Sequence, residues 1–384
     1  MPRHPDPSGA MGSIPGGFVF TPLAGKVRNL GGAVFPLHVG DTWKEPFEGG
    51  RMEDLVAGEG LHRYSDPPGR RDLIDAIVEK VRRDNRIPCD PASVLVTSGA
   101  TGALAAALGM LLDPGEEVLI LAPFWPLIPG MVRTFRARPV EVPFYDRAGS
   151  AAQAVLAISR RITDRTVALY VSTPSNPTGR VLAAEWLEAI AGLAARHGLW
   201  ILSDEVYEHY AYRGEHVSIA RFAPERTLTA FSFSKSYGMA GNRTGYLVGP
   251  PQAIREALKV STHTVYAAST AGQEAGRRAI LHGGAWLSET KRDYRAAGEA
   301  AARTLGLAPP EGSTFLFFDV APHLDERGIR GFLEDCLDDG IVLAPGLSCG
   351  ADYASWVRLC YTCLAPEKTV EGVARLARRL GRNP

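Results

Sequence analysis

The chain has 384 residues, enough for two domains or for one large and one small domain. Its residues are 45% hydrophobic and 22% charged, as in a typical globular protein. The 42 Lys and Arg residues balance the 42 Asp and Glu residues, so no net charge favours binding to nucleic acid or to a membrane surface. The five cysteines are an odd number, which does not suggest a secreted disulfide framework.

The N-terminal residues 1–17 are rich in proline and glycine and have no apolar core like that of a signal peptide. We expect this segment to be a disordered lead. The chain has no apolar run of the roughly eighteen residues that would predict a membrane-spanning helix. These observations predict a cytoplasmic protein.

Short apolar runs alternate with helical patterns through the middle of the chain. Thr101–Leu112 and Glu185–Arg196 have the composition and spacing of helices. The runs that predict strands cover residues 93–97, 117–121, 166–171, 199–202, 227–231 and 245–248. Strands that are apolar on both faces and alternate with helices favour an α/β fold, with a mainly parallel sheet covered by helices on both sides. Ligands of such sheets bind outside the carboxyl ends of the strands.

The pattern changes near residue 281. A long charged helix is expected at Trp286–Leu305, followed by two turn-rich strand regions and an amphipathic helix at Glu367–Leu380. This part predicts a smaller α+β domain. Within it, Cys360 and Cys363 form a C-x-x-C pair, but no second pair or nearby histidine completes a zinc site. We interpret them as ordinary buried thiols and predict no bound metal.

The most informative motif surrounds Lys235. Small and hydroxyl residues flank this lysine, with Ser232 before it and Arg243 after it. A lysine amine forms an imine with an aldehyde, while hydroxyl and guanidinium groups hold a phosphate. The motif therefore suits a phosphorylated aldehyde. Taken alone, it leaves open a surface lysine in a loop rich in serine and glycine.

Two further motifs follow predicted strands. Ala100 and Thr101 stand at a glycine-containing turn before a helix, where free backbone N–H groups and the helix dipole can hold a phosphate. The alternative is a plain connection between strand and helix. Trp125 follows the next strand, where its ring either stacks on an aromatic cofactor or fills the core.

Four more polar or charged residues stand out. Asn176 lies in an Asn-Pro-Thr-Gly sequence, which by itself predicts only a turn. Asp204 ends an apolar strand and needs a partner, either a cationic ring nitrogen or the N-terminus of a helix that it caps. Tyr207 either donates a hydrogen bond or packs. Arg358 interrupts an apolar strand, where it either binds a carboxylate or extends to solvent from an edge.

Together and in this order, these motifs resemble those of the fold type I aminotransferases, the pyridoxal-phosphate (PLP) family that includes aspartate aminotransferase. The resemblance covers roughly residues 35–380. It implies a sheet of the seven-stranded type and a large cofactor-binding domain at residues 45–280. It also implies a small domain made of residues 18–44 and 281–384.

The resemblance implies a role for each cofactor-site residue. Lys235 would hold PLP covalently and move the proton, and Asp204 would keep the pyridine nitrogen cationic. Tyr207 and Asn176 would bond the phenolic oxygen, and Trp125 would stack on the ring. The residues implied to hold the phosphate are Ala100, Thr101, Ser232 and Arg243.

The resemblance also implies substrate and partner contacts. Arg358, with Asn176, would bind the substrate α-carboxylate, and Gly40 matches a glycine on the substrate side. Tyr64 matches a tyrosine that reaches across a homodimer interface to the phosphate in the neighbouring subunit. We therefore expect a homodimer with shared active sites.

The implied activity is transamination between an L-amino acid and a 2-oxo acid by a ping-pong mechanism, with Lys235 acting as base and then as acid. The same cofactor site also serves lyases, decarboxylases and cyclases. A non-catalytic PLP-sensing domain is a further alternative. Some relatives that prefer acidic substrates have a basic residue where this chain has Thr101, which slightly disfavours aspartate.

Overall fold

The computed structural model describes residues 8–14, 26, 33–55 and 60–382. Within the segment expected to be a disordered lead, residues 1–7 and 15–17 lie outside the described residues, and Met11–Ser13 forms a short 3-10 helix. The proposed small-domain segment 18–44 is described only at residue 26 and from residue 33 onward.

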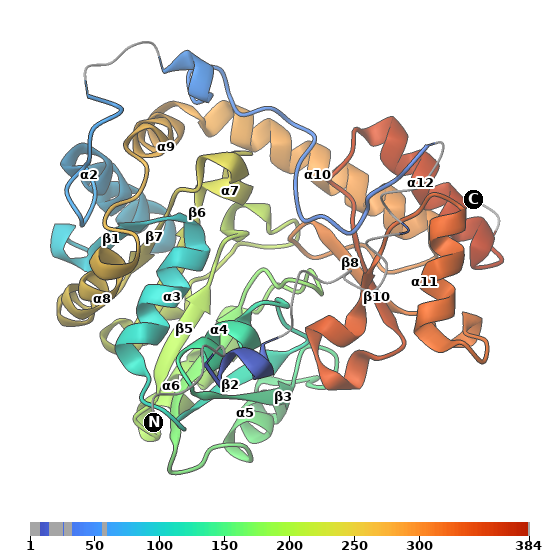
Figure 1. Cartoon of the computed structure of the whole chain (residues 1–384), viewed down its shortest axis with the longest axis horizontal. Coiled ribbons are helices and arrows are strands. Elements are labelled where there is room, and N and C mark those ends of the chain that lie inside the picture. Colours follow the sequence, from blue (N-terminus) through green and yellow to red (C-terminus); the bar gives the residue numbers. More distant parts are fainter. Residues whose placement is uncertain (1–7, 15–25, 27–32, 56–59, 383–384) are drawn as a thin grey trace, which may run out of the picture.

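A seven-stranded sheet occupies the centre of the molecule (Figure 1). Its strand order is β1-β7-β6-β5-β4-β2-β3, and β7 alone runs antiparallel to its neighbours. The strands are β1 (Val94–Thr97), β2 (Glu117–Ala122), β3 (Arg138–Pro143), β4 (Thr166–Ser172), β5 (Trp200–Asp204), β6 (Thr227–Ser232) and β7 (Gly245–Val248). The predicted mainly parallel sheet is confirmed, and β3 is the one strand of this sheet that the sequence pattern did not indicate.

Helices cover both faces of this sheet because successive residues of its strands point to opposite sides. On one face, Ile120 and Tyr170 belong to a core with three helices, whereas Leu119 and Leu169 face the opposite layer. The first layer contains α3 (Gly99–Leu111), α4 (Ile128–Thr134) and α8 (Pro251–Thr264). The second contains α2 (Arg71–Lys80), α5 (Ala151–Ser159), α6 (Ala184–Arg196) and α9 (Thr270–His282). The two predicted helices in this region correspond to α3 and α6.

A smaller antiparallel sheet, in the order β8-β10-β9, lies beside the first (Figure 1). Its strands are β8 (Phe315–Asp319), β9 (Ala344–Pro345) and β10 (Trp356–Cys360). Its helices are α10 (Gly284–Thr304), α11 (Gly328–Asp338) and α12 (Pro366–Arg379). The predicted α+β unit is confirmed, and Phe35 and Leu37 from the N-terminal part pack into its core. The domain boundaries at residues 45 and 281 stay a prediction.

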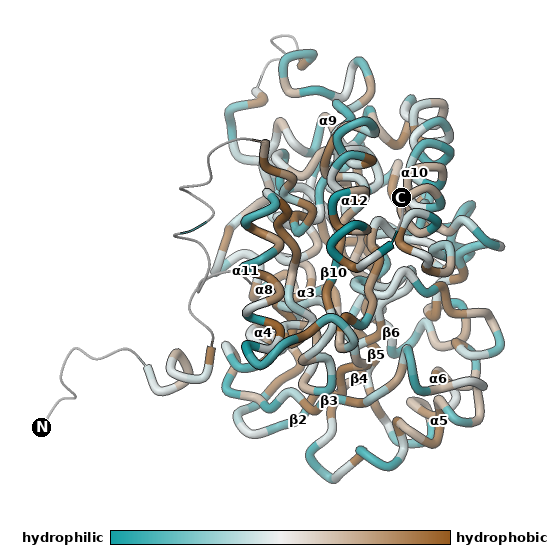
Figure 2. Tube along the Cα trace, turned by 90° about the vertical axis from the view of Figure 1, so that its right-hand side faces the viewer, coloured by the Kyte–Doolittle hydropathy of each residue, from teal (hydrophilic) through white to brown (hydrophobic). Residues whose placement is uncertain are grey.

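The hydropathy colouring follows these layers. Hydrophobic colour runs through the central strands, while α10 carries many hydrophilic residues (Figure 2). In the described part of the chain, no helix is both long and apolar enough to cross a membrane.

Candidate active site

A cavity of about 170 Å³ opens where the central parallel strands end. Nine of the candidate cofactor residues line it, contributed by loops and helices after β1, β2, β4, β5 and β6. They are Ala100, Thr101, Trp125, Asn176, Asp204, Tyr207, Ser232, Lys235 and Arg243. Residues that are far apart in sequence therefore converge because the carboxyl ends of parallel strands meet at one edge.

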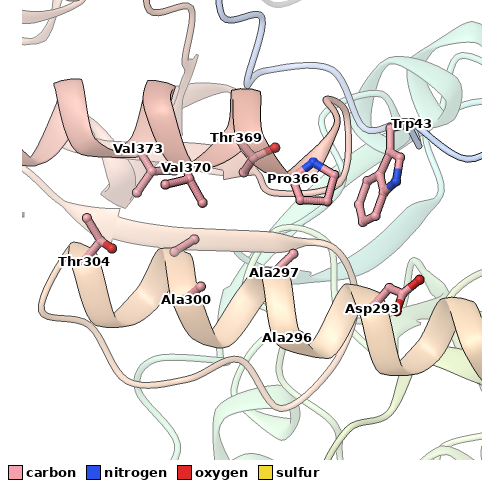
Figure 3. A pocket seen from close by; sticks show the side chains of 11 residues that line it. Trp43, Asp293, Ala296, Ala297, Ala300, Thr304, Pro366, Thr369, Val370 and Val373 are labelled. Carbon is pink, nitrogen blue, oxygen red and sulfur yellow. The ribbon is translucent and has the colours of Figure 1, made fainter.

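A larger groove of about 440 Å³ lies between α10 and α12 (Figure 3). Alanine and valine side chains form most of its walls, with Trp43 at one end. Its one carboxylate, Asp293, is already 2.5 Å from the ammonium group of Lys44. The groove thus lacks the clustered reactive groups that the smaller cavity contains.

Lys235 lies on the short helix α7 (Phe233–Ser236), directly after β6. The hydroxyl of Ser232 caps this helix by accepting a hydrogen bond from the Ser234 backbone N–H at 3.1 Å. The Lys235 amine donates a hydrogen bond to the Gly40 carbonyl. Burial lowers the pKa of Lys235, which favours the neutral amine needed for attack on an aldehyde. The alternative of a surface lysine is wrong.

Gly40 has a steric reason to be glycine. A Cβ atom there would lie 2.8 Å from the Phe315 ring. Phe315 also packs edge-on against Tyr207, with the ring centroids 5.8 Å apart. The predicted glycine on the substrate side thus lies where the loop after residue 38 meets the cavity.

An anion site is built around the first turn of α3. Arg243 adopts a left-handed backbone conformation with φ 52° and donates a hydrogen bond to the Ala240 carbonyl at 2.9 Å. A Cβ atom at Gly99 would lie 2.6 Å from its Nη2 atom, so the guanidinium packs directly on the helix start. Ala100 and Thr101 occupy that first turn, where backbone N–H groups have no partner within the helix. A guanidinium beside a helix N-terminus suits a phosphate.

Asp204 is the last residue of β5 and is buried. Its Oδ2 atom accepts a hydrogen bond from the Tyr170 hydroxyl at 2.6 Å. Burial raises the pKa of the Asp204 carboxyl to about 6. The helix-cap alternative is wrong, because only the 3-10 turn Glu208–Tyr210 follows. A buried carboxylate at the cavity wall instead fits a cation in the cavity, such as a protonated pyridine nitrogen.

Arg358 reaches this region from β10 of the smaller sheet. Its Nη1 donates to Asn176 Oδ1 at 2.9 Å and its Nη2 to the His38 carbonyl at 3.0 Å. The guanidinium lies over the Phe315 ring, and Nε has no hydrogen-bond partner among the described residues. Arg358 is only 3% exposed, so the alternative of an arginine extending to solvent is wrong. It does not itself line the cavity, but its partner Asn176 does.

Tyr64 is the one candidate that lies apart from the cavity. Its side chain is 87% exposed, and its ring contacts Tyr266 with centroids 5.1 Å apart. It lines shallow surface hollows with Ser65 and Thr270. Within one chain, therefore, this hydroxyl has no role at the cavity.

The sequence analysis missed three residues whose polar groups lie at the cavity or bond its candidate residues. Ser234 lines the cavity, Tyr170 bonds Asp204, and the His38 carbonyl anchors Arg358. Ser234 was recognisable as a further hydroxyl beside Lys235. The contacts of Tyr170 and His38 arise between segments distant in sequence and leave no local signal.

The cysteines are unpaired thiols. Cys360 is buried as predicted, but Cys363 is only partly buried because it lies at the end of the strand region, where the chain turns toward α12. No group of three or more possible metal ligands occurs within the described residues.

The chain matches the family described as "Aminotransferase class I and II" over residues 38–376. It is 35% identical over 334 residues to an aspartate/prephenate aminotransferase of Thermus thermophilus, covering 84% of this chain and 85% of the relative. It is 32% identical over 336 residues to aromatic-amino-acid aminotransferase 2 of Thermococcus litoralis, and the match covers 84% of this chain and 85% of that relative. The structure of Thermus thermophilus aspartate aminotransferase with maleate superposes with a TM-score of 0.89 and 30% identity, covering 97% of this chain and 99% of that one.

Proposed function

Because the chain belongs to the class I and II aminotransferase family, it is a PLP-dependent aminotransferase, and we propose here which residues serve the reaction and which substrates it prefers. The observation that carries the assignment of residues is the convergence of nine candidates on one cavity. The cavity fits the cofactor, because it combines a candidate anion site, a buried carboxylate and a partly buried lysine amine.

We assign the PLP phosphate to the first turn of α3, between Arg243 and Ser232. Asp204 would face the ring nitrogen, and Trp125 would lie against the ring. When bound, PLP supplies an aldehyde for covalent attachment and a ring that withdraws electrons from the substrate. The protein supplies orientation, because its donors and acceptors surround the cavity before any ligand enters.

Lys235 would act both as the attachment point and as the group that moves a proton. Its burial favours a neutral amine, which would accept the proton from the substrate α-carbon and then donate it to the former aldehyde carbon of the cofactor. Tyr207 and Asn176 would bond the phenolic oxygen. Burial raises the pKa of Tyr207 above its ordinary value, so its hydroxyl stays a donor.

The substrate carboxylate would bind Arg358, whose guanidinium is held by Asn176 and the His38 carbonyl. In the described part of the chain, the cations that line the cavity are Lys235 and Arg243, and both have roles at the cofactor. No further cation among the described residues lines the cavity to bind a second carboxylate. We therefore propose amino acids with uncharged side chains as preferred donors. Acidic amino acids are the second candidate, favoured by the names of the aspartate/prephenate relatives.

A panel of amino acids tests both the transamination reaction and the preferred amino donors. The purified enzyme is loaded with PLP and mixed with neutral, aromatic and acidic amino acids while its absorbance is recorded. We expect conversion to the amine form of the cofactor with neutral or aromatic donors, and recovery when a 2-oxo acid is added. Preference for aspartate or glutamate would favour the second candidate. Release of pyruvate and ammonia would indicate a lyase, and no spectral change would indicate a binding protein.

We also propose a homodimer in which Tyr64 donates to the phosphate of the neighbouring subunit. Its high exposure supports this, since the described residues of one subunit offer the Tyr64 hydroxyl no hydrogen-bond partner. Sedimentation at assay concentration tests the assembly, and a fully active monomer would contradict it. The five unpaired cysteines support a cytoplasmic location, which cell fractionation tests.

A further inference from the structure

Tyr170 lies beneath the cavity, on the strand next to that of Asp204. Strands β4 and β5 run parallel, with Tyr170 opposite Leu202 and Ser172 opposite Asp204. Tyr170 and Leu202 point to the face covered by α3, and Asp204, two residues farther along β5, points the same way. The hydroxyl of Tyr170 reaches Asp204 Oδ2 at 2.6 Å, although the two residues are 34 positions apart in sequence.

In the described part of the chain, no other side chain donates a hydrogen bond to the Asp204 carboxylate. Within the described residues, Tyr170 is the one side chain that bonds its carboxylate, and the other contact is the Val206 backbone N–H at 3.4 Å. The adjacent Glu205 instead accepts hydrogen bonds from Ser203 and Ser218 and lies 2.8 Å from His216. Asp204 therefore depends on a single side chain for its orientation.

Other ionisable groups also face this carboxylate. Glu205 opposes its ionisation through like charge, while Tyr145 and Tyr207 lie close enough to interact electrostatically with it. Lys235 and Arg243 share the cavity wall with it. Among the residues that the structure describes, only the Tyr170 hydroxyl donates a side-chain hydrogen bond to it, which offsets part of the effect of burial.

A donor of this kind affects a buried carboxylate in two ways. It stabilises the ionised form, since the hydroxyl hydrogen bonds more strongly to a carboxylate than to a carboxylic acid. It also restricts the rotamer of a side chain that lines the cavity. Burial raises the pKa of Tyr170 well above its ordinary value, so the hydroxyl stays protonated and remains a donor at any working pH.

We propose that Tyr170 is a positioning residue that keeps the Asp204 carboxylate ionised and aimed at the ring nitrogen of PLP. The proposal rests on the role assigned above to Asp204. Tyr170 would thus affect the reaction from within β4 through its contact with Asp204, although it does not itself line the cavity.

The substitution Tyr170→Phe tests this, with Tyr145→Phe as a matched control. Both tyrosines are buried and lose one hydroxyl, but the Tyr145 hydroxyl donates to the Ser172 carbonyl at 2.5 Å and accepts from the Ser172 N–H at 3.0 Å. We expect Tyr170→Phe to lower kcat on the order of 10-fold or more and to weaken PLP binding measured by equilibrium dialysis. The KM for the amino acid should change little.

The pH profile separates positioning from a merely structural role. Without the hydrogen bond from the Tyr170 hydroxyl, the pKa of Asp204 should rise. In Tyr170→Phe, the fall of kcat/KM on the acid side of its pH profile should therefore move to higher pH. The control should move the acid limb of the pH profile and the PLP affinity far less than Tyr170→Phe does, because the Tyr145 hydroxyl bonds Ser172 and not Asp204, even if its melting temperature falls. An unshifted limb in Tyr170→Phe, or equal effects of both variants, would overturn the proposal.

The double variant Tyr170→Phe/Asp204→Asn tests the role of Tyr170 separately from the role of Asp204. If Tyr170 acts through Asp204, the double variant should be no slower than Asp204→Asn alone. Additive losses would show that Tyr170 acts by another route and would overturn the proposal. A near-normal rate of Asp204→Asn would instead refute the role of Asp204, and with it the premise on which the proposal rests.

Discussion

Replacing Arg358 by lysine should weaken amino-acid binding far more than PLP binding. The wild-type guanidinium is held in place by two hydrogen bonds, to Asn176 Oδ1 at 2.9 Å and to the His38 carbonyl at 3.0 Å. Lysine keeps the charge but has one nitrogen, so it cannot keep both anchors and also present two donors to a carboxylate.

The structure sets the expected size of this effect. Loss of one charge-assisted hydrogen bond costs about 1.5–3 kcal/mol. Since 1.4 kcal/mol corresponds to about a tenfold change in affinity, KM for the amino acid should rise roughly 10- to 150-fold. Affinity for PLP should stay nearly constant, because Arg358 does not line the cofactor cavity.

Steady-state kinetics with an active amino acid, together with a PLP titration, measure both quantities. Arg375→Lys is the matched control, because Arg375 also lies over an aromatic ring, that of Phe35, and donates to the Asp339 carbonyl at 3.1 Å. The control should leave KM unchanged. An unchanged KM in Arg358→Lys for every active substrate would show that another group holds the carboxylate.

Three further outcomes follow from the geometry. Asp204→Asn should fold normally but lose orders of magnitude in kcat, because an amide does not stabilise a pyridinium; a near-normal rate would contradict this. Glu208, paired with Lys80 at 2.5 Å, has its pKa lowered to about 2 from 4.5 by Lys80 despite its burial. The stability that ionised Glu208 contributes is therefore present above pH 4.5 and is lost as the pH falls toward 2. The difference in melting temperature between wild type and Glu208→Gln should narrow over that range. A constant difference would contradict the expected loss of stability at low pH. Gly99→Ala should weaken PLP binding in a titration, since its Cβ would displace Arg243 from the helix start, and unchanged affinity would refute the phosphate site.

The sequence predicted six of the seven strands, including the edge strand β1, because they are mostly buried and therefore apolar. It missed the other edge strand, β3, whose residues include Arg138, Pro139 and Glu141, because most of its side chains are not buried and an edge position tolerates charge and proline. Further helices were not indicated, among them α2, α4, α5, α8, α9 and α11. In α11, two glycines in the first turn interrupt the helical pattern.

The candidate cavity residues could be predicted because each lies in a short local motif. Tyr170 could not, since its role depends on β4 pairing with β5 and on which face the side chain takes. The same holds for the His38 carbonyl, which becomes an anchor for Arg358 only when the N-terminal segment packs beside β10. Contacts of this kind arise from tertiary structure and leave no spacing in the sequence.

The assignment of Lys235 as the residue that attaches PLP can be tested directly. The PLP-loaded enzyme can be reduced with borohydride, digested, and searched by mass spectrometry for a pyridoxyl group. We expect the label on the peptide that contains Lys235, and no label in Lys235→Ala. A label on another lysine, or a reducible link that persists in Lys235→Ala, would contradict it.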